Sequence, residues 1–400
     1  MYTYSKIARF AAVLLALVGY ILYVEEYVNA YIDYDLSYHV KLWKTKVWGP
    51  SSVFCSPSAS HARQVLPSNN NTPPPSWNSV VEDYLRDSQN TKFVVYRPHP
   101  HQGMCNRMLH SISSLMFAMA THRKLWIDWP EVPSHSFEGV EQIGISSYES
   151  LFSKTRGANA WPTNTTTVVE SDEVDSCMAY RLRFEDVRQF KQDEPVISIA
   201  SGDFWGSLLI LNPHIATFRG LDINEGFPIL FKTLFFPLAP LPPPIQKCSW
   251  VFQYRCQWPK PYVTTSFDRY IECAQAHGFT KRDAQTSWII TDNPATLIRS
   301  SSLATKSTFL SKMNFIEKSK PCRGPCGDNE TLRHMYALSS CKNAVLTHSS
   351  SFGVCIVGLA NIENAVKVTR FGECIKPKHK MIDPNLQSKY GGERTLLHEI

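Results

Sequence analysis

Short runs of apolar residues alternate with helical patterns along this chain, and each run ends at a polar residue. The clearest runs are Phe93–Tyr96, Trp250–Tyr254, Ser287–Thr291 and Ala344–Thr347. Their aromatic and β-branched residues favour strands. Strands that alternate with helices indicate an α/β fold with a parallel sheet, and open sheets of this kind bind ligands where the strands end.

The segment after the first run predicts a βαβ unit. Apolar residues from Met108 to Met119 repeat at helical spacing in a segment that begins at Arg107 and ends near Thr121. A second strand is expected at Lys124–Asp128. Similar patterns predict further helices over residues 266–277, 330–340 and 352–360.

A cluster of prolines at Pro237–Pro244 separates two such halves. We therefore expect two Rossmann-like lobes, residues 91–244 and 245–375, that face each other across a cleft. A short tail over residues 376–400 would follow the second lobe.

An apolar run near the N-terminus, Phe10–Val24, follows Lys6 and Arg9. Extended at both ends, it is long enough for a helix to cross the ~30 Å core of a bilayer. The positive charge before it predicts a cytosolic tail over residues 1–9, a signal anchor over residues 10–28 and a lumenal body. A cleaved signal peptide and a soluble helix are the alternatives, and the first of these also sends the body into the secretory pathway.

Residues 29–90 are predicted to form a stem or linker, because polar and proline-rich stretches such as Asn69–Pro75 cannot bury enough apolar surface to fold.

The chain has 11 cysteines. In a secretory compartment, Cys322 and Cys326 are better explained by a disulfide than by zinc, because no second ligand pair lies at finger spacing. Cys105 and Cys355 lie in apolar or motif segments and are expected to be buried thiols.

The composition excludes two classes of protein. With 43% hydrophobic and 19% charged residues, the chain is not wholly disordered. The net charge of +6 suits a surface that meets phosphates, but it is far below that of a protein that packages nucleic acid, and no nucleic-acid partner is expected.

Polar residues at the ends of two predicted strands suggest an anion site. Arg255 ends one strand, and Ser349–Ser351 open the helix that follows another. Hydroxyls and backbone N–H groups at a helix N-terminus bind anions, and an arginine facing them could clamp a diphosphate. A salt-bridge arginine and a serine helix cap are the alternatives. The sequence contains no P-loop, G-x-G-x-x-G or G-x-S-x-G motif, so it does not match the NTPase, dinucleotide-binding or hydrolase templates. The diphosphate of a nucleotide sugar is then the simplest ligand for the site.

The same segments resemble motifs of the fucosyltransferases. Gly103–Arg107 and Thr121–Asp128 resemble the N-terminal segment of the plant xyloglucan-type enzymes and their protist and algal relatives. Phe252–Arg255 and Ile290–Asn293 are similar to the first two motifs of the wider α1,2/α1,6/protein-O-fucosyltransferase group. Val345–Gly353 resembles the third, which ends in T-x-x-S-x-F-G.

This resemblance implies a GT-B fold, GDP-fucose as the donor substrate, inversion at the anomeric carbon, and neither a metal nor another cofactor. It places Arg255 at the β-phosphate, where it would stabilise the leaving group, with the acceptor on the side of the N-terminal lobe. The residues that it places at the donor are Asn106, Arg107, Arg255, Asp292, His334, Ser349, Ser350, Ser351, Phe352 and Gly353.

The residue that activates the acceptor is not identified by any motif. His99, His101 and Asp128 are candidates because of their expected position in the cleft, with loop histidines and a strand-end aspartate as the alternative interpretation. We take Arg255, His101 and Asp128 as the candidate catalytic set. Two residues depart from the motifs, since Cys105 replaces a glycine and His334 replaces an acidic residue.

We therefore expect a glycosyltransferase, specifically a fucosyltransferase, acting on a glycan or glycoprotein acceptor. It would be a single-pass type II protein of the Golgi membrane with its catalytic part in the lumen. One alternative is a catalytically silent lumenal protein that binds glycans or nucleotides on the same fold. The other is a transferase that uses a different nucleotide sugar.

Overall fold

The chain divides into two compact units, Met1–Gln64 and Val65–Ile400, and the computed structural model describes parts of the second. The described residues are 75–87, 91–98, 103–129, 135–137, 140–142, 147–152, 169–173, 182, 185–190, 192–200, 204–238, 245–255, 257–258, 260–261, 265–316, 325–348, 350–369 and 371–376. No helix within these ranges is long and apolar enough to cross a membrane. The predicted anchor at residues 10–28 and the tail after residue 376 lie outside them.

The N-terminal lobe contains a four-stranded parallel sheet in the order β2-β1-β6-β5. Its strands are β1 (Phe93–Tyr96), β2 (Lys124–Ile127), β5 (Val169–Glu173) and β6 (Val196–Ala200). The helix α3 (Met104–Ala120) connects β1 to β2, which confirms the predicted βαβ unit.

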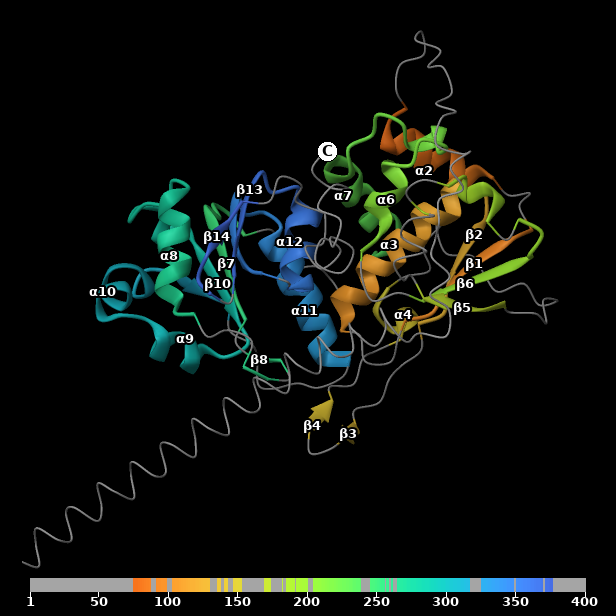
Figure 1. Ribbon diagram of the computed structural model, residues 1–400. Helices are drawn as coiled ribbons and strands as arrows, with labels where there is room; N and C mark the ends of the chain where they lie inside the picture. The colour runs from red at the N-terminus through yellow and green to blue at the C-terminus, as the bar shows by residue number, and fades with distance from the viewer. Residues whose placement is uncertain are drawn as a thin grey trace, which may run out of the picture. The chain divides into compact units, whose positions relative to one another are not determined.

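The helix α3 is apolar around most of its circumference because it is covered on several sides. It contacts β1 and β2 of the sheet, and it also contacts the helices α6 (Gly206–Ile210), α7 (Ile223–Leu234) and α12 (Ser351–Ala360) (Figure 1). A helix that is hydrophobic all round is expected in such a position.

A further helix, α2 (Trp77–Arg86), lies inside residues 29–90, which the sequence assigns to a stem. Ser76 and Ser79 form a reciprocal capping box at its start. The Trp77 indole Nε1–H donates to the Asp222 carbonyl at 2.7 Å, and the Trp77 ring lies directly over Gly226, where an added Cβ would come within 2.1 Å of it. This helix packs its buried apolar face against α7, and the stem predicted over residues 29–90 stays a prediction for the residues before it.

The C-terminal lobe is built on a six-stranded sheet in the order β11-β10-β7-β12-β13-β14. The strands are β7 (Trp250–Tyr254), β10 (Trp288–Thr291), β11 (Asn314–Phe315), β12 (Asn343–Thr347), β13 (Asn364–Val368) and β14 (Cys374–Ile375). Only β14 is antiparallel to its neighbour. The two sheets, whose strands are mostly parallel, confirm the expected α/β class, and the division into lobes at residues 91–244 and 245–375 stays a prediction.

Helices cover both faces of this second sheet. The helix α8 (Phe267–Ala276) packs on one face, against side chains that include Phe252, Val345 and Val366. The helices α11 (Pro325–Leu338) and α12 cover the other face, against side chains that include Ala344 and Leu346 (Figure 1). Successive residues of each strand therefore point alternately toward α8 and toward α12.

The remaining elements are short. They are β3 (His135–Phe137), β4 (Val140–Gln142), α4 (Tyr148–Leu151), η1 (Val187–Gln189), η2 (Ala216–Phe218), β8 (Gln257–Trp258), β9 (Lys260–Pro261), η3 (Asp283–Thr286), α9 (Pro294–Ser300), α10 (Leu303–Thr305) and the π-helical turn η4 (Lys306–Leu310).

Two disulfides lie within the described residues, and both belong to the C-terminal lobe. Cys248–Cys341 joins the segments that enter β7 and β12, and Cys273–Cys374 joins α8 to β14. Cys105 and Cys355 are free and buried, as the sequence predicts. The side chain of Cys326 and all of Cys322 lie outside the described residues, so that pairing stays a prediction.

We predict that replacing either disulfide pair with serines lowers the free energy of unfolding by about 2–5 kcal/mol, because each closes a loop of 93 or 101 residues that the unfolded chain would otherwise sample freely. Urea unfolding of the two double variants and the unchanged chain measures this loss. If all three proteins have the same free energy of unfolding, the two disulfides do not stabilise the fold.

We also predict that Cys105 and Cys355 resist alkylation in the folded protein. Burial raises the pKa of the Cys355 thiol well above its ordinary value, and Cys105 beside it adds to the rise, so Cys355 stays protonated at neutral pH and is a poor nucleophile. Peptide mass spectrometry after iodoacetamide treatment should find both residues modified only when denaturant is present. Rapid modification of either without denaturant would show that the α3–α12 contact opens readily.

Candidate anion-binding site at the ends of the C-terminal strands

Three polar residues follow neighbouring parallel strands of the second sheet and therefore lie along one edge. Arg255 follows β7, Asp292 follows β10 and His348 follows β12. Arg255 and Asp292 are half-buried. The carboxyl edge of a parallel sheet is where ligands bind in open α/β folds. The structure thus brings Arg255 next to the strand that leads into the serine loop.

The Thr347 hydroxyl connects the ends of β7 and β12. Its Oγ1 donates to the Gln253 carbonyl at 3.0 Å and accepts the Arg255 backbone N–H at 3.0 Å. A threonine hydroxyl has a single proton, so the Tyr270 hydroxyl, 2.8 Å away, must be the donor in the third contact. The Gln253 Oε1 in turn accepts the Thr347 backbone N–H at 3.1 Å. These bonds fix the point at which Arg255 leaves the sheet.

The helix α12 begins at this edge without the usual serine cap. Ser350 is its N-cap residue, but the side chain makes no capping hydrogen bond. Ser350 is only 3% exposed, and its Oγ has no hydrogen-bond partner within the described part of the chain. The first N–H groups of an α-helix have no intrahelical acceptor, and they carry the positive end of the helix dipole. A buried hydroxyl without a partner beside them indicates a site that a ligand acceptor could complete.

Gly353 brings the first turn of α12 close to the sheet. A Cβ at this position would lie 3.2 Å from both the Gln253 Oε1 and a Leu346 methyl carbon. Gln253 is already held by Thr347, so it has little freedom to move aside. The absence of a side chain at Gly353 therefore sets how closely the start of α12 approaches the ends of β7 and β12.

His348 lies between the serine loop and β13. Its backbone N–H donates to the Val368 carbonyl at 3.0 Å. Burial, and to a lesser degree the neighbouring Lys367 ammonium, lower the pKa of the His348 imidazole below its ordinary value, so this side chain is neutral at pH 7. Lys367 itself is almost completely buried.

The residues predicted at the donor from the N-terminal lobe lie in the first turn of α3. Asn106 is half-buried, whereas Arg107 is 0% exposed, with its guanidinium carbon 5.4 Å from the centre of the Trp129 ring. Burial lowers the pKa of Arg107, and Tyr96 and Asp328 partly offset this effect. Cys105 lies in the same turn without a positive φ, so the backbone there does not require the glycine of the motif.

The candidate base Asp128 is engaged by a neighbouring residue. The Arg97 Nε lies 2.6 Å from the Asp128 Oδ2, and the two residues follow the adjacent strands β1 and β2. His99, His101 and Ser349 lie outside the described residues.

His334 and the remaining two donor residues lie in the C-terminal lobe. On α11, the His334 Nε2 lies 3.9 Å from the Glu330 Oε1, one turn earlier. Ser351 and Phe352 are half-buried at the start of α12.

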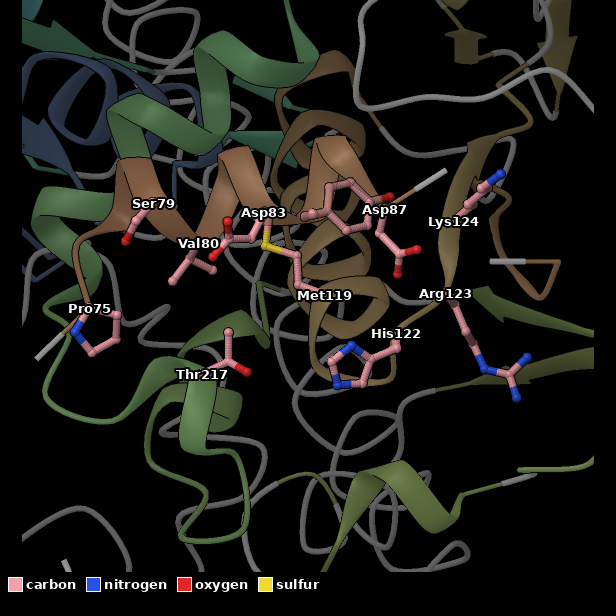
Figure 2. Close-up of a pocket in the computed structure, with 11 residues that line it drawn as sticks. Pro75, Ser79, Val80, Asp83, Asp87, Met119, His122, Arg123, Lys124 and Thr217 are labelled. Carbon is pink, nitrogen blue, oxygen red and sulfur yellow. The ribbon is translucent and has the colours of Figure 1, made fainter. Parts of the chain in front are cut away.

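A cavity of about 330 Å³ lies away from these residues, at the opposite edge of the first sheet. Figure 2 shows it beside α2, the C-terminal end of α3 and the start of β2. Acidic and basic side chains both line it, among them Asp83, Asp87, His122 and Arg123.

Within the described residues there is no group of three or more metal-ligating side chains. The expectation that the protein requires no metal stays a prediction.

Three polar contributors to the site were missed by sequence reasoning. Thr347 and Tyr270 appeared only as the last residue of a strand and a residue of a helix. Lys367 was not considered at all, although a lysine in the otherwise apolar run Ala365–Val368 is a visible departure from an apolar strand.

No protein-family model and no curated protein sequence matches the chain. The structure is similar to that of an Arabidopsis thaliana FUT1 mutant in complex with GDP, at 14% identity and a TM-score of 0.47, with 76% of each chain covered. It is also similar to the fucosyltransferase NodZ from Bradyrhizobium, at 14% identity and a TM-score of 0.36, with 72% of this chain and 98% of that chain covered. At this identity and these scores, function has to be inferred from the site itself.

We predict that Thr347→Val lowers the free energy of unfolding by about 1–3 kcal/mol, because valine has a similar shape but leaves the buried Arg255 N–H and Tyr270 hydroxyl without their partner. Thr347→Ser is the matched control, since it keeps the hydroxyl. Chemical denaturation of both variants measures the difference. If the valine variant is no less stable than the serine variant, the hydroxyl does not hold the two strand ends together.

Proposed function

We propose that this chain is an inverting glycosyltransferase that transfers fucose from GDP-fucose to a glycan or glycoconjugate. The observation that carries the proposal is the start of α12, where the buried Ser350 hydroxyl makes no capping bond and Arg255 follows the adjacent strand. Backbone N–H groups, a hydroxyl and an arginine from neighbouring elements are hydrogen-bond donors that suit a diphosphate.

The chemistry of the reaction fits this donor set. The acceptor hydroxyl attacks the anomeric carbon, its proton passes to a base, and the bond from that carbon to the β-phosphate oxygen breaks so that GDP leaves. Negative charge grows on the β-phosphate as the bond breaks. Fixed positive charge at that phosphate stabilises the transition state more than the ground state, and this accelerates the reaction.

The choice of guanine and fucose is supported by the sequence. The segments that resemble fucosyltransferase motifs are Phe252–Arg255, Ile290–Asn293 and Val345–Gly353. They fall at the ends of β7, β10 and β12, which are neighbours at one edge of the sheet. A GT-B arrangement is supported by the two parallel sheets, one in each lobe.

For the base, Asp128 is our candidate within the described residues. The ion pair with Arg97 holds its carboxylate at the ends of β1 and β2. His101 is retained as the second candidate. We also propose that the donor is bound by Asn106 and Arg107 of the N-terminal lobe and by Asp292 and His334 of the C-terminal lobe.

The location is proposed to be the Golgi lumen, with residues 10–28 as a type II membrane anchor. The basic residues before the apolar run support this orientation, and the two disulfides support an oxidising compartment.

A silent protein that binds nucleotide without transferring sugar is the second candidate. The observation that favours it is the close Arg97–Asp128 pair, which already occupies the carboxylate of one candidate base.

We predict that Arg255→Ala lowers the turnover of GDP-fucose by about 10²–10³-fold, the usual cost of removing one group that stabilises developing charge. The assay measures GDP release by the full chain with a panel of acceptor glycans, and circular dichroism checks that the variant folds. The matched control is Arg282→Ala, an exposed arginine of the same lobe that precedes η3, and its rate should be unchanged.

A near-normal rate in folded Arg255→Ala would contradict the assignment of this arginine to the leaving group. If the unchanged chain binds GDP but releases none from GDP-fucose with any acceptor, the silent binding protein is the correct function.

A further inference from the structure

The cavity of about 330 Å³ beside α2 is separate from the residues proposed to bind the donor. Val80, Asp83 and Asp87 line it from α2, and Figure 2 shows His122 and Thr217 across from them. His122 follows α3 and Thr217 belongs to η2, so segments that are far apart in the sequence meet here. Pockets for small ligands measure about 300–1,000 Å³, so this cavity has room for a small molecule or for a short piece of a polymer.

Part of the cavity lining is apolar. Val80 and Met119 are buried, and the Tyr84 side chain is held in place because its hydroxyl accepts the Leu125 backbone N–H at 2.8 Å. Burial raises the pKa of the Tyr84 phenol to about 12, so Tyr84 is uncharged at neutral pH. Apolar lining of this kind packs against the C–H groups of a ligand.

The rest of the lining is polar, and its charges balance. Asp83 and Asp87 contribute two carboxylates, and Arg123 and Lys124 contribute two cations. The Arg123 guanidinium is fixed because it donates to the Glu194 carbonyl at 2.7 Å. A ligand with a net charge of either sign would meet like charge in this lining, whereas a neutral polar ligand would not.

His122 has a backbone conformation that favours glycine. Its φ of 51° lies in the left-handed region, which glycine usually occupies just after a helix. The residue is exposed, so packing in the core does not explain a large side chain at this position. The histidine supplies the cavity with an imidazole, which can both donate and accept hydrogen bonds.

We propose that this cavity binds a neutral sugar unit of a glycan. Ionised carboxylates only accept hydrogen bonds, so Asp83 and Asp87 suit a ligand that carries several O–H donors. The His122 imidazole and the Thr217 hydroxyl can bond to the remaining hydroxyl groups as donors or as acceptors. A sugar ring also presents C–H surface, which matches the apolar part of the lining.

Such a site would hold a glycan on the N-terminal lobe, away from the start of α12. Attachment at one point raises the local concentration of the rest of the glycan chain around the protein. The binding of sugar here does not require the transfer reaction, so the inference goes beyond the proposed function and does not rest on it.

The first test compares His122→Gly with the unchanged full chain. The probes are the methyl glycosides of glucose, galactose, mannose, xylose and fucose, and saturation-transfer NMR measures their dissociation constants. The matched control is Asn361→Gly, because Asn361 is an exposed residue that ends α12 in the same left-handed conformation, with φ 50°.

We expect at least one neutral probe to bind the unchanged chain and to bind His122→Gly about three- to ten-fold more weakly, the loss of one hydrogen bond. Both glycine variants should melt at or above the temperature of the unchanged chain, since glycine suits a positive φ. Asn361→Gly should bind sugar normally. If no neutral probe binds, or if His122→Gly binds like the unchanged chain, the inference is wrong.

A second pair of variants tests the carboxylate. Asp83→Asn should weaken the same probe by about ten-fold, because a neutral amide replaces a charged acceptor. Glu82→Gln is the control, since Glu82 is the preceding residue, also pairs with Arg86, and does not line the cavity. Equal binding by these two variants would contradict the role of Asp83.

Charged probes test the class of ligand. Methyl glycosides of glucosamine and glucuronic acid should bind more weakly than that of glucose, because each meets like charge in the lining. Tighter binding of either would overturn the assignment to a neutral sugar. Arg255→Ala should bind the neutral probe normally, and loss of binding in this variant would place the sugar at the donor site instead.

Discussion

The close contact between the first turn of α12 and the ends of β7 and β12 is the constraint on which the candidate site depends. Gly353 allows this contact, and Gln253 and Thr347 form the surface beneath it. If the helix started farther from the sheet, its first N–H groups would lie farther from the end of β7. Each strand end is fixed by hydrogen bonds that are buried from water, where such bonds are costly to break.

The same helix links the two lobes. α12 contacts α3 and α7 of the N-terminal lobe, and the Cys355 thiol donates to the Cys105 carbonyl at 3.7 Å. Cys105 lies one residue before Asn106, which the motif places at the donor. The helix α12, whose start is the proposed phosphate site, is therefore packed against the first turn of α3, which carries Asn106 and Arg107. Cys105, which replaces a motif glycine, belongs to this contact.

Much of this arrangement could be predicted from the sequence. Apolar runs located β7, β10 and β12, and their last residues located Arg255 and the serine loop, because strand ends follow from short-range patterns. The helix α2 was missed because proline-rich flanks hid the apolar spacing of Trp77, Val80 and Val81. The hydrogen bonds of the Thr347 hydroxyl with Arg255 and Gln253 could not be predicted. They require the register of strands whose residues are 92 or more positions apart in sequence.

The central claim is that the diphosphate of the donor binds at the start of α12. A crystal structure of the chain with GDP tests it most directly. We predict that β-phosphate oxygens lie about 2.7–3.2 Å from backbone nitrogens of the first α12 turn and from the Arg255 guanidinium. GDP bound elsewhere, for example in the cavity beside α2, with the start of α12 open to water, would contradict it.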